Sequence, residues 1–277
     1  MRPGGIGDEA GRGLDAQLAA LDTLGWRELE LRTVDGTAIA DLDDRAFDRI
    51  AGRLATDGIT VPCVASRIGN WARPVDGDFT LDRDELARLL PRCGRLGTPY
   101  LRVMSWQAGQ VSDAEWGVLA RRRLRELSER AGEAGVTLVH ENCTGWAAKD
   151  PDRMRELLRA VPGLRLLFDM GNGIEYGYRA RDLLGEILPW VVHVHVKDAA
   201  RDARGCTYTK PGEGDADVAG CLRTLRDHGY AGVLSLEPHV GMRPHRAQSV
   251  PDAELAAGFV AAGRALAELC REAVPCR

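Results

Sequence analysis

The chain has 277 residues, of which 44% are hydrophobic and 28% charged, enough apolar material for one large α/β domain. Its formal net charge of −4 lacks the basic excess that a nucleic-acid-binding surface needs. We therefore expect a single domain over residues 1–277 and no nucleic-acid partner.

Seven cysteines are scattered along the chain without a C-x-x-C pair. An odd number of isolated cysteines is typical of reduced thiols, and not of a disulfide framework or a zinc ribbon. No apolar run approaches the roughly 18 residues of a membrane span, and the N-terminus has no signal-peptide core. The sequence thus predicts a cytoplasmic protein without a membrane partner.

Strand-like and helix-like segments alternate along the first half of the chain. Short β-type runs are predicted at Arg2–Ile6, Glu28–Leu31, Ile59–Val64 and Pro99–Met104. Helical apolar spacing follows them at Leu14–Leu24, Arg45–Thr56, Leu81–Leu96 and Asp113–Ala134. A glycine ends each of these helices or comes shortly after it, as expected at a helix C-terminus.

The second half continues the alternation. Strands are predicted at Val136–Val139, Leu164–Phe168, Trp190–Val194 and Val233–Leu236. Helices are predicted at Pro151–Ala160, Ala180–Leu188, Val218–Asp227 and Asp252–Ala273, and a loop at Asp198–Gly214. Eight strand–helix units over about 250 residues favour a single (β/α)₈ TIM barrel. A doubly wound open sheet is the rival, but no Gly-rich phosphate-binding fingerprint follows the first strand.

Four of the later strands lead directly into a residue that can bind a metal. These residues are Glu141, Asp169, His195 and Glu237. In a TIM barrel the C-terminal strand ends meet at one mouth, so the three carboxylates would crowd together. A divalent cation would relieve that repulsion, and an oxygen-rich set with one imidazole suits Mn²⁺, Mg²⁺ or Co²⁺, with Zn²⁺ as an alternative. The competing interpretation is an isolated salt bridge at each strand end.

The same residues carry a family resemblance. H-E-N-x-x-G at Glu141, F-D-x-G-N at Asp169, H-x-H-x-K-D at His195 and S-L-E-P at Glu237 resemble the sugar phosphate isomerase/epimerase superfamily, with its xylose isomerase-like TIM barrel. Stretches after the second, third and fourth strands agree, so the resemblance covers most of the chain. It implies that the four residues bind one divalent metal, and that Glu141 and Glu237 also act as the acid/base groups beside the reacting carbon.

Two departures separate the chain from endonuclease IV-like members of that superfamily, which build a trinuclear zinc site with extra histidines. The early strand tips offer Ser66 and Ser105, and Asn172 stands where many relatives carry histidine. We therefore expect one metal and not three, which makes DNA cleavage at abasic sites a poor fit. Asn172 also leaves the type of epimerase open.

Further residues near the strand ends are candidate substrate contacts. Trp71, Trp106 and Trp146 follow strand tips and could form aromatic walls for a sugar ring, or simply pack at the barrel rim. His193 is expected one layer below His195, as a hydrogen-bonded interior residue. The predicted substrate-binding set is Arg32, Ser66, Trp106, Asn172, Lys197, Arg201 and His239.

The implied activity is isomerisation or epimerisation of a sugar, keto-sugar or cyclitol by proton abstraction α to a carbonyl, with a metal-stabilised enediolate. A dehydratase of the inosose-processing type is the near alternative, because the same site could expel a β-hydroxyl. A carbohydrate-binding barrel without turnover is the alternative from another class. The resemblance is also compatible with a homo-oligomer, without indicating an interface.

Overall fold

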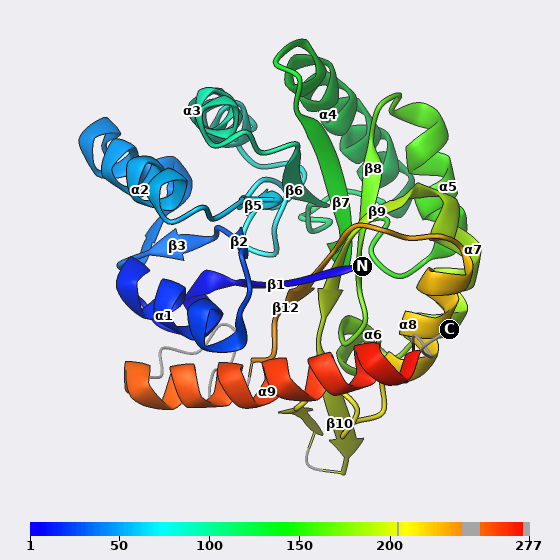
Figure 1. The fold of residues 1–277 in the computed structure, drawn as a ribbon. Coiled ribbons are helices and arrows are strands. Elements are labelled where there is room, and N and C mark those ends of the chain that lie inside the picture. Colours follow the sequence, from blue (N-terminus) through cyan, green and yellow to red (C-terminus); the bar gives the residue numbers. More distant parts are fainter. Residues whose placement is uncertain (204, 240–249, 274–277) are drawn as a thin grey trace.

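A computed structural model describes residues 1–203, 205–239 and 250–273. Eight parallel strands form a nearly closed barrel with helices between them (Figure 1). The barrel strands are β1 (Arg2–Ile6), β2 (Glu28–Glu30), β5 (Cys63–Ala65), β6 (Tyr100–Ser105), β7 (Thr137–Gly145), β8 (Arg165–Asp169), β9 (Val191–Val196) and β12 (Val233–Leu236). The prediction of a TIM barrel is therefore confirmed.

The first strand closes onto the last, because β1 pairs in parallel with both β12 and β2. Its glycines are needed for these close approaches. A Cβ atom on Gly4 would lie 2.6 Å from the backbone oxygen of Glu28, and one on Gly5 would overlap the ring of Phe259. The two glycines of β1, which are unusual in a strand, are therefore required because neighbouring atoms leave no room for a Cβ.

The barrel is completed between β2 and β5 by isolated backbone bonds in place of a regular ladder. The Leu31 N–H donates to the Cys63 carbonyl at 3.2 Å, and the Ala65 N–H donates to the Leu31 carbonyl at 2.8 Å. Glu30 and Ser66 therefore lie at neighbouring strand ends, although 36 positions separate them in the sequence.

The helices that cover the barrel bury their apolar faces against the strands. They are α1 (Leu14–Leu24), α2 (Asp44–Thr56), α3 (Thr80–Leu96), α4 (Asp113–Glu133), α5 (Pro151–Ala160), α7 (Ala180–Ile187), α8 (Val218–Asp227) and α9 (Asp252–Ala273). The long C-terminal helix α9 lies beside the N-terminal helix α1, so the first and last helices of the chain are neighbours on the outside of the barrel (Figure 1). Within the described ranges, no helix combines the length and apolar character that crossing a bilayer requires.

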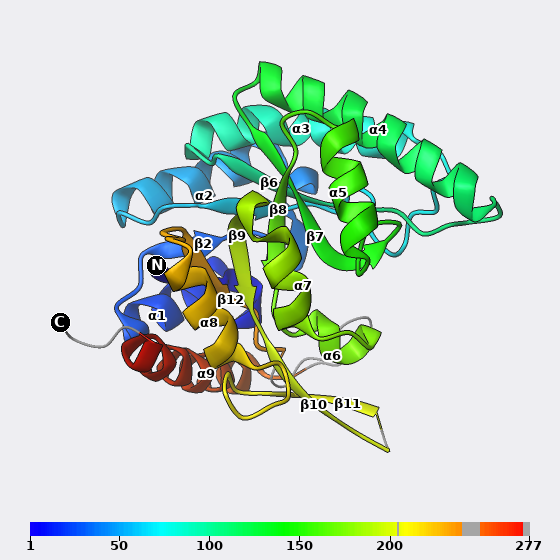
Figure 2. The same cartoon turned by 90° about the vertical axis from the view of Figure 1, so that its right-hand side faces the viewer.

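The structure corrects one segment and adds smaller elements. The predicted loop Asp198–Gly214 contains an antiparallel hairpin of β10 (Asp198–Asp202) and β11 (Gly205–Thr209), which projects from the barrel (Figure 2). A second, short hairpin joins β3 (Thr33–Val34) to β4 (Thr37–Ala38), and a one-turn helix α6 (Asn172–Tyr176) follows β8. These elements lie just beyond the C-terminal ends of barrel strands.

Candidate metal and catalytic site

The four residues predicted at the strand ends lie together in the barrel. Glu141 is in β7, Asp169 ends β8, His195 is in β9 and Glu237 follows β12, and each offers a ligand atom within 4.8 Å of the others. His195 Nδ1 is 3.6 Å from Glu141 Oε1, 3.8 Å from Asp169 Oδ2 and 3.6 Å from Glu237 Oε2. All four are buried, so their charges need compensation within the protein.

Each carboxylate turns one oxygen toward His195 Nδ1 and is held in place by other groups of the protein. Asp169 Oδ1 accepts the N–H groups of Gly171 (2.8 Å) and Asn172 (2.7 Å), which leaves Oδ2 facing the cluster. Glu141 Oε2 accepts from Arg102 at 3.2 Å, and Oε1 faces the ring. The local turn after β8 therefore fixes the orientation of Asp169 through backbone donors.

Glu237 is held by two cations. Its Oε1 accepts from Arg32 Nη1 and its Oε2 from Lys197 Nζ, both at 2.7 Å. Burial alone would raise the pKa of Glu237, but Lys197 and His239 outweigh it and hold that pKa well below its usual range. Burial opposes ionisation of Glu141 in the same way, and Arg102 keeps the pKa of Glu141 low. Both proposed acid/base groups are thus carboxylates at neutral pH.

The donor set fits a divalent cation. His195 Nδ1 and Asp169 Oδ2 are buried and accept no hydrogen bond from any described residue, although Lys197 Nζ lies 3.0 Å from Oδ2 as an ion partner. Two ligand atoms that each lie about 2.1 Å from one cation are at most about 4.2 Å apart, and His195 Nδ1 lies 3.6–3.8 Å from the three carboxylate oxygens. Three carboxylate oxygens and one imidazole nitrogen form a mostly hard set.

A cavity of about 460 Å³ opens next to the cluster. The predicted substrate contacts that line it, together with Glu141 and Glu237, are Arg32, Ser66, Asn172, Lys197 and His239. Trp71, a candidate aromatic wall in the sequence, also lines it, together with Tyr176 and Tyr208, which were not predicted. The cavity therefore joins the candidate acid/base groups to both polar and ring-stacking surfaces, as a sugar or cyclitol site would require.

Two predicted substrate contacts are not brought to this cavity. Trp106 is fully buried, donates its indole N–H to Asp82 at 2.8 Å and packs edge-on against Phe79. Arg201 lies on β10 and donates to the carbonyl oxygens of Ile174 and Glu175, at 2.6 and 2.9 Å. Trp106 thus belongs to the packing behind the site, and Arg201 ties the hairpin to α6.

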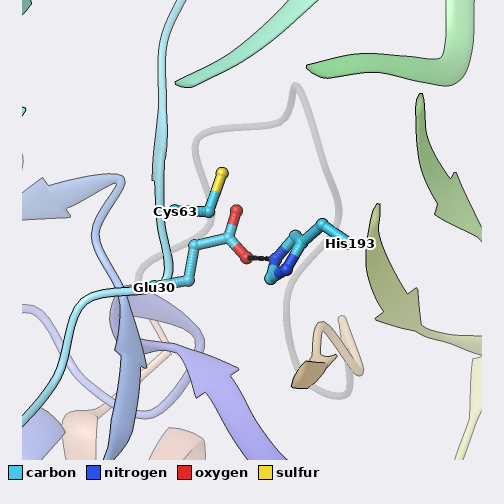
Figure 3. Close-up of side chains that lie close together, drawn as sticks. All are labelled: Glu30, Cys63 and His193. Atoms are coloured by element: carbon cyan, nitrogen blue, oxygen red, sulfur yellow. Dashed lines mark hydrogen bonds and ion pairs between the residues drawn. The ribbon is translucent and has the colours of Figure 1, made fainter. Parts of the chain in front are cut away.

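Glu30 is a buried carboxylate that the sequence reasoning did not include in the site. It ends β2 and accepts from His193 Nε2 at 2.7 Å, with Cys63 beside it (Figure 3). Its two oxygens also lie 3.0 and 3.1 Å from His195 Nε2. His193 is therefore the interior hydrogen-bonded residue that was predicted. Glu30 shares the signal that identified the other carboxylates, an acidic residue at the end of a strand.

Glu9 and Tyr208 were also missed. Glu9 accepts from Arg32 at 2.6 Å and from the backbone N–H of His239 at 3.0 Å. Burial would raise the pKa of Glu9, yet His239 and Arg32 lower it to about 2. Tyr208 comes from the unpredicted hairpin and packs edge-on against His239, with the ring centroids 4.8 Å apart. No local sequence pattern places either residue here, because both reach the site through tertiary structure.

Comparison with known proteins agrees with this arrangement. A family model described as a xylose isomerase-like TIM barrel matches residues 18–257. An inosose dehydratase from Clostridium perfringens is 28% identical over 144 residues, 46% of this chain and 48% of that protein. A 2-epi-5-epi-valiolone 7-phosphate 2-epimerase from an Actinoplanes species is 32% identical over 143 residues, 50% of this chain and 49% of that protein. The chain spans about half the length of the curated relatives it matches.

Solved structures show the same fold. The IOLI protein with a bound zinc atom aligns over 100% of both chains, with a TM-score of 0.73 and 17% identity. A xylose isomerase-like TIM barrel protein from Mycobacterium smegmatis, in complex with magnesium, aligns over 92% of this chain and 88% of that chain, with a TM-score of 0.66 and 19% identity. Structural neighbours thus include one zinc-bound and one magnesium-bound barrel.

Proposed function

Because the chain belongs to the xylose isomerase-like TIM-barrel family, we propose that it is a divalent-metal-dependent isomerase or epimerase of a sugar, keto-sugar or cyclitol. The observation that carries this proposal is the buried group Glu141, Asp169, His195 and Glu237, whose ligand atoms lie within 4.8 Å of one another beside a cavity. We further propose that the protein acts in the cytoplasm, without nucleic-acid or membrane partners.

Glu141, Asp169, His195 and Glu237 would hold one cation, Mn²⁺, Mg²⁺ or Co²⁺, with Zn²⁺ as an alternative. Bound there, it would supply Lewis-acid stabilisation of negative charge that develops on a carbonyl oxygen. Glu141 and Glu237 reach the cavity from β7 and from the end of β12, which β8 and β9 separate in the barrel. One would take the proton α to the carbonyl, and the other would return one to the opposite face in an epimerisation.

The surrounding cations keep these carboxylates ionised and oriented. Arg102 holds Glu141, while Arg32 and Lys197 hold Glu237. Lys197 and His239 also line the cavity, and Lys197 Nζ lies 3.3 Å from His239 Nε2, which can accept from it because Nδ1 of that ring donates to Glu9. Lys197 is placed to donate a hydrogen bond to a substrate hydroxyl or carbonyl oxygen.

Dehydration of a similar substrate is the second candidate, and the position of Lys197 favours it. Burial opposes the charge of this ammonium group, but Asp169 and Glu237 raise its pKa well above the ordinary value. The carboxylate that takes the α-proton would return it to the departing β-hydroxyl, which leaves as water while the ammonium group donates a hydrogen bond to that oxygen. One of the relatives is an inosose dehydratase, which supports the same reading.

The test is solvent-deuterium exchange followed by proton NMR. Metal-free protein is reloaded with Mg²⁺ and offered ketoses, keto-cyclitols and their phosphates in D₂O. We expect deuterium to appear next to a carbonyl, and Glu237→Gln and Glu141→Gln to slow the exchange at least about 100-fold. Exchange with inversion or carbonyl migration would establish the epimerase or isomerase, and loss of water would establish the dehydratase. Binding of a sugar without exchange would reject both in favour of a carbohydrate-binding barrel.

A further inference from the structure

We propose that Glu30 is a positioning residue, which fixes the orientation and tautomer of His195 so that Nδ1 faces the metal ligands. This inference rests on the proposed metal site, because it assigns His195 Nδ1 to the cation. Glu30 comes from β2, three strands from β9 around the barrel, and 165 positions separate it from His195.

The Glu30 carboxylate lies within hydrogen-bonding distance of both imidazole rings, those of His193 and His195. Its oxygens lie 3.0 and 3.1 Å from His195 Nε2, and Oε2 also lies 2.7 Å from His193 Nε2. The rings of His193 and His195 stand edge to face, with their centroids 5.6 Å apart. Glu30 and His195 are fully buried, so no water competes for these bonds.

An ionised carboxylate can only accept hydrogen bonds, so each Nε2 that it contacts must carry a hydrogen. For His195 this directs Nδ1 at Glu141, Asp169 and Glu237, where a cation would take the place of any Nδ1 proton and use the lone pair. The opposite tautomer would point an N–H at the place where a cation is proposed. It would also set a lone pair against the Glu30 carboxylate. Glu30 therefore selects the form of His195 that can be a ligand.

A second metal ion held by Glu30, Cys63 and His193 is the rival interpretation, since these three ligand atoms also lie within 4.8 Å of one another. The contacts oppose it. Glu30 already accepts from two imidazoles, and the Cys63 thiol lies 3.7 Å from the Val64 carbonyl, to which it donates. Figure 3 shows the Glu30 carboxylate directed at the His193 ring. The group is thus complete as a hydrogen-bonded cluster.

Titration with Mn²⁺ measures whether Glu30 acts through His195. The free-ion signal in electron paramagnetic resonance gives Kd and stoichiometry for the wild type, Glu30→Gln, Glu30→Asp and His193→Gln. We expect about a 10- to 100-fold weaker Kd for Glu30→Gln. Glu30→Asp should weaken Kd similarly, because it keeps the charge but is too short to reach both rings. His193→Gln is the matched control in the same cluster and should change Kd less than threefold.

Nitrogen NMR of the imidazoles reports which ring nitrogen carries the hydrogen, a property that a merely structural role of Glu30 would not change. The chain has only six histidines, so the His195 signals can be assigned with a His195→Gln spectrum. In Zn²⁺-loaded wild type, Nε2 should carry the hydrogen and Nδ1 should show the shift of a metal-bound nitrogen. In Glu30→Gln the Nε2 signal should move. If Glu30→Gln does not fold, the wild-type spectrum still decides.

Three results would overturn the inference. They are an unprotonated Nε2 in the wild type, an unchanged Kd in Glu30→Gln, and two Mn²⁺ ions per chain that fall to one in Cys63→Ala. Failure of the proposed function looks different, because wild type would then bind no Mn²⁺ at the cluster or catalyse no deuterium exchange. The metal-free spectrum would still report whether His195 Nε2 donates to Glu30.

Discussion

Lys197 contacts two of the three carboxylate oxygens that face His195 Nδ1. Its Nζ is 3.0 Å from Asp169 Oδ2 and 2.7 Å from Glu237 Oε2, and the side chain is almost fully buried. In the metal-free protein this ammonium group is therefore the cation that separates like charges.

Lys197→Met should lower the free energy of unfolding of metal-free protein by about 3 kcal/mol, because it leaves buried carboxylates without their partner. Saturating Mn²⁺ should restore most of that loss, since the ion replaces the missing charge. Urea denaturation with chelator and with Mn²⁺ measures both values. Lys210→Met, which removes an exposed lysine paired with Glu213, is the control and should change stability by less than about 0.5 kcal/mol. Equal losses in the two variants would contradict the prediction.

His140 makes stability depend on pH. It is fully buried next to Glu141, and neither ring nitrogen has a hydrogen-bond partner among the residues that the structure describes. Burial disfavours the charged ring and lowers the pKa of His140 to about 4, against an ordinary value of 6.5. Between those values the unfolded chain binds the proton and the folded chain does not.

The free energy of unfolding should therefore fall by roughly 3 kcal/mol from this residue as the pH drops from 6.5 to 4, with no further loss below. Above pH 6.5 both states are neutral and the contribution is constant. His140→Leu lacks this dependence, so the difference between wild-type and variant stability, measured by urea titration at each pH, should shrink by that amount. A difference that stays constant over this range would show that His140 is already protonated in the fold.

At the scale of elements, Asp198 holds residues 198–216, the segment with the β10–β11 hairpin, in place through hydrogen bonds. Its carboxylate accepts four backbone N–H groups, those of Ala199, Gly212, Gly214 and Ala216. These bonds fold the chain between β11 and α8 back onto the start of β10. They thereby set the base of the hairpin that carries Tyr208 to the cavity.

Asp198→Asn should cost about 2 kcal/mol locally, because the amide nitrogen cannot accept two of these four bonds. Hydrogen exchange should accelerate at the amides of Gly212 and Gly214, and remain unchanged in the distant helix α4. Asp182→Asn, an exposed acid on α7, serves as the control and should leave the pattern intact. Unaltered protection at both glycines would mean that other contacts hold the segment.

The hairpin also shows where sequence reasoning ends. The bounds of α1, α5, α8, α9 and β12 agree with the periodicity of the sequence, because each buries one regular apolar face or run. Strand β1 also has the predicted bounds, although its Gly-rich sequence has no apolar pattern. Asp198–Gly214 is polar and Gly-rich, and the bonds to Asp198 that order it join residues up to 18 positions apart. Its strands could not be inferred from local preference.

The same limit applies within the site. Glu141, Asp169, His195 and Glu237 could be grouped from the sequence, because parallel barrel strands bring their C-terminal ends together. Arg102 and Glu30 lie on earlier strands, and their pairing with Glu141 and His195 depends on which way each side chain turns inside the closed barrel. Trp106 follows a strand end like the four clustered residues, but its positive φ of 54° and its bond to Asp82 turn it away.

For the whole molecule, metal binding should raise thermal stability. A ligand at about 100 times its Kd that binds only the folded state adds roughly 2.7 kcal/mol, which for a chain of this size corresponds to a rise in Tm of about 5–10 °C. Differential scanning calorimetry of chelated protein, with and without Mn²⁺, measures the shift. Asp169→Asn, which removes one ligand charge, should lose most of it. An equal rise in that variant would place the ion elsewhere.

The single domain over residues 1–277 stays a prediction, and one cooperative transition in these scans would support it.

The pairing of Glu141, Asp169 and Glu237 with Arg102, Lys197 and Arg32 has an electrostatic consequence. Arg32 is shared with Asp8 and Glu9, so five carboxylates meet three cationic side chains and negative charge is in excess before any ion arrives. A divalent cation would offset this excess and place positive charge beside the cavity, shielded from water by the barrel. Such a site would discriminate by charge acquired during reaction, because a neutral polyol gains little from the bound cation. Planar anions with adjacent oxygens, which mimic an enediolate, should therefore inhibit the loaded protein and ignore the chelated one.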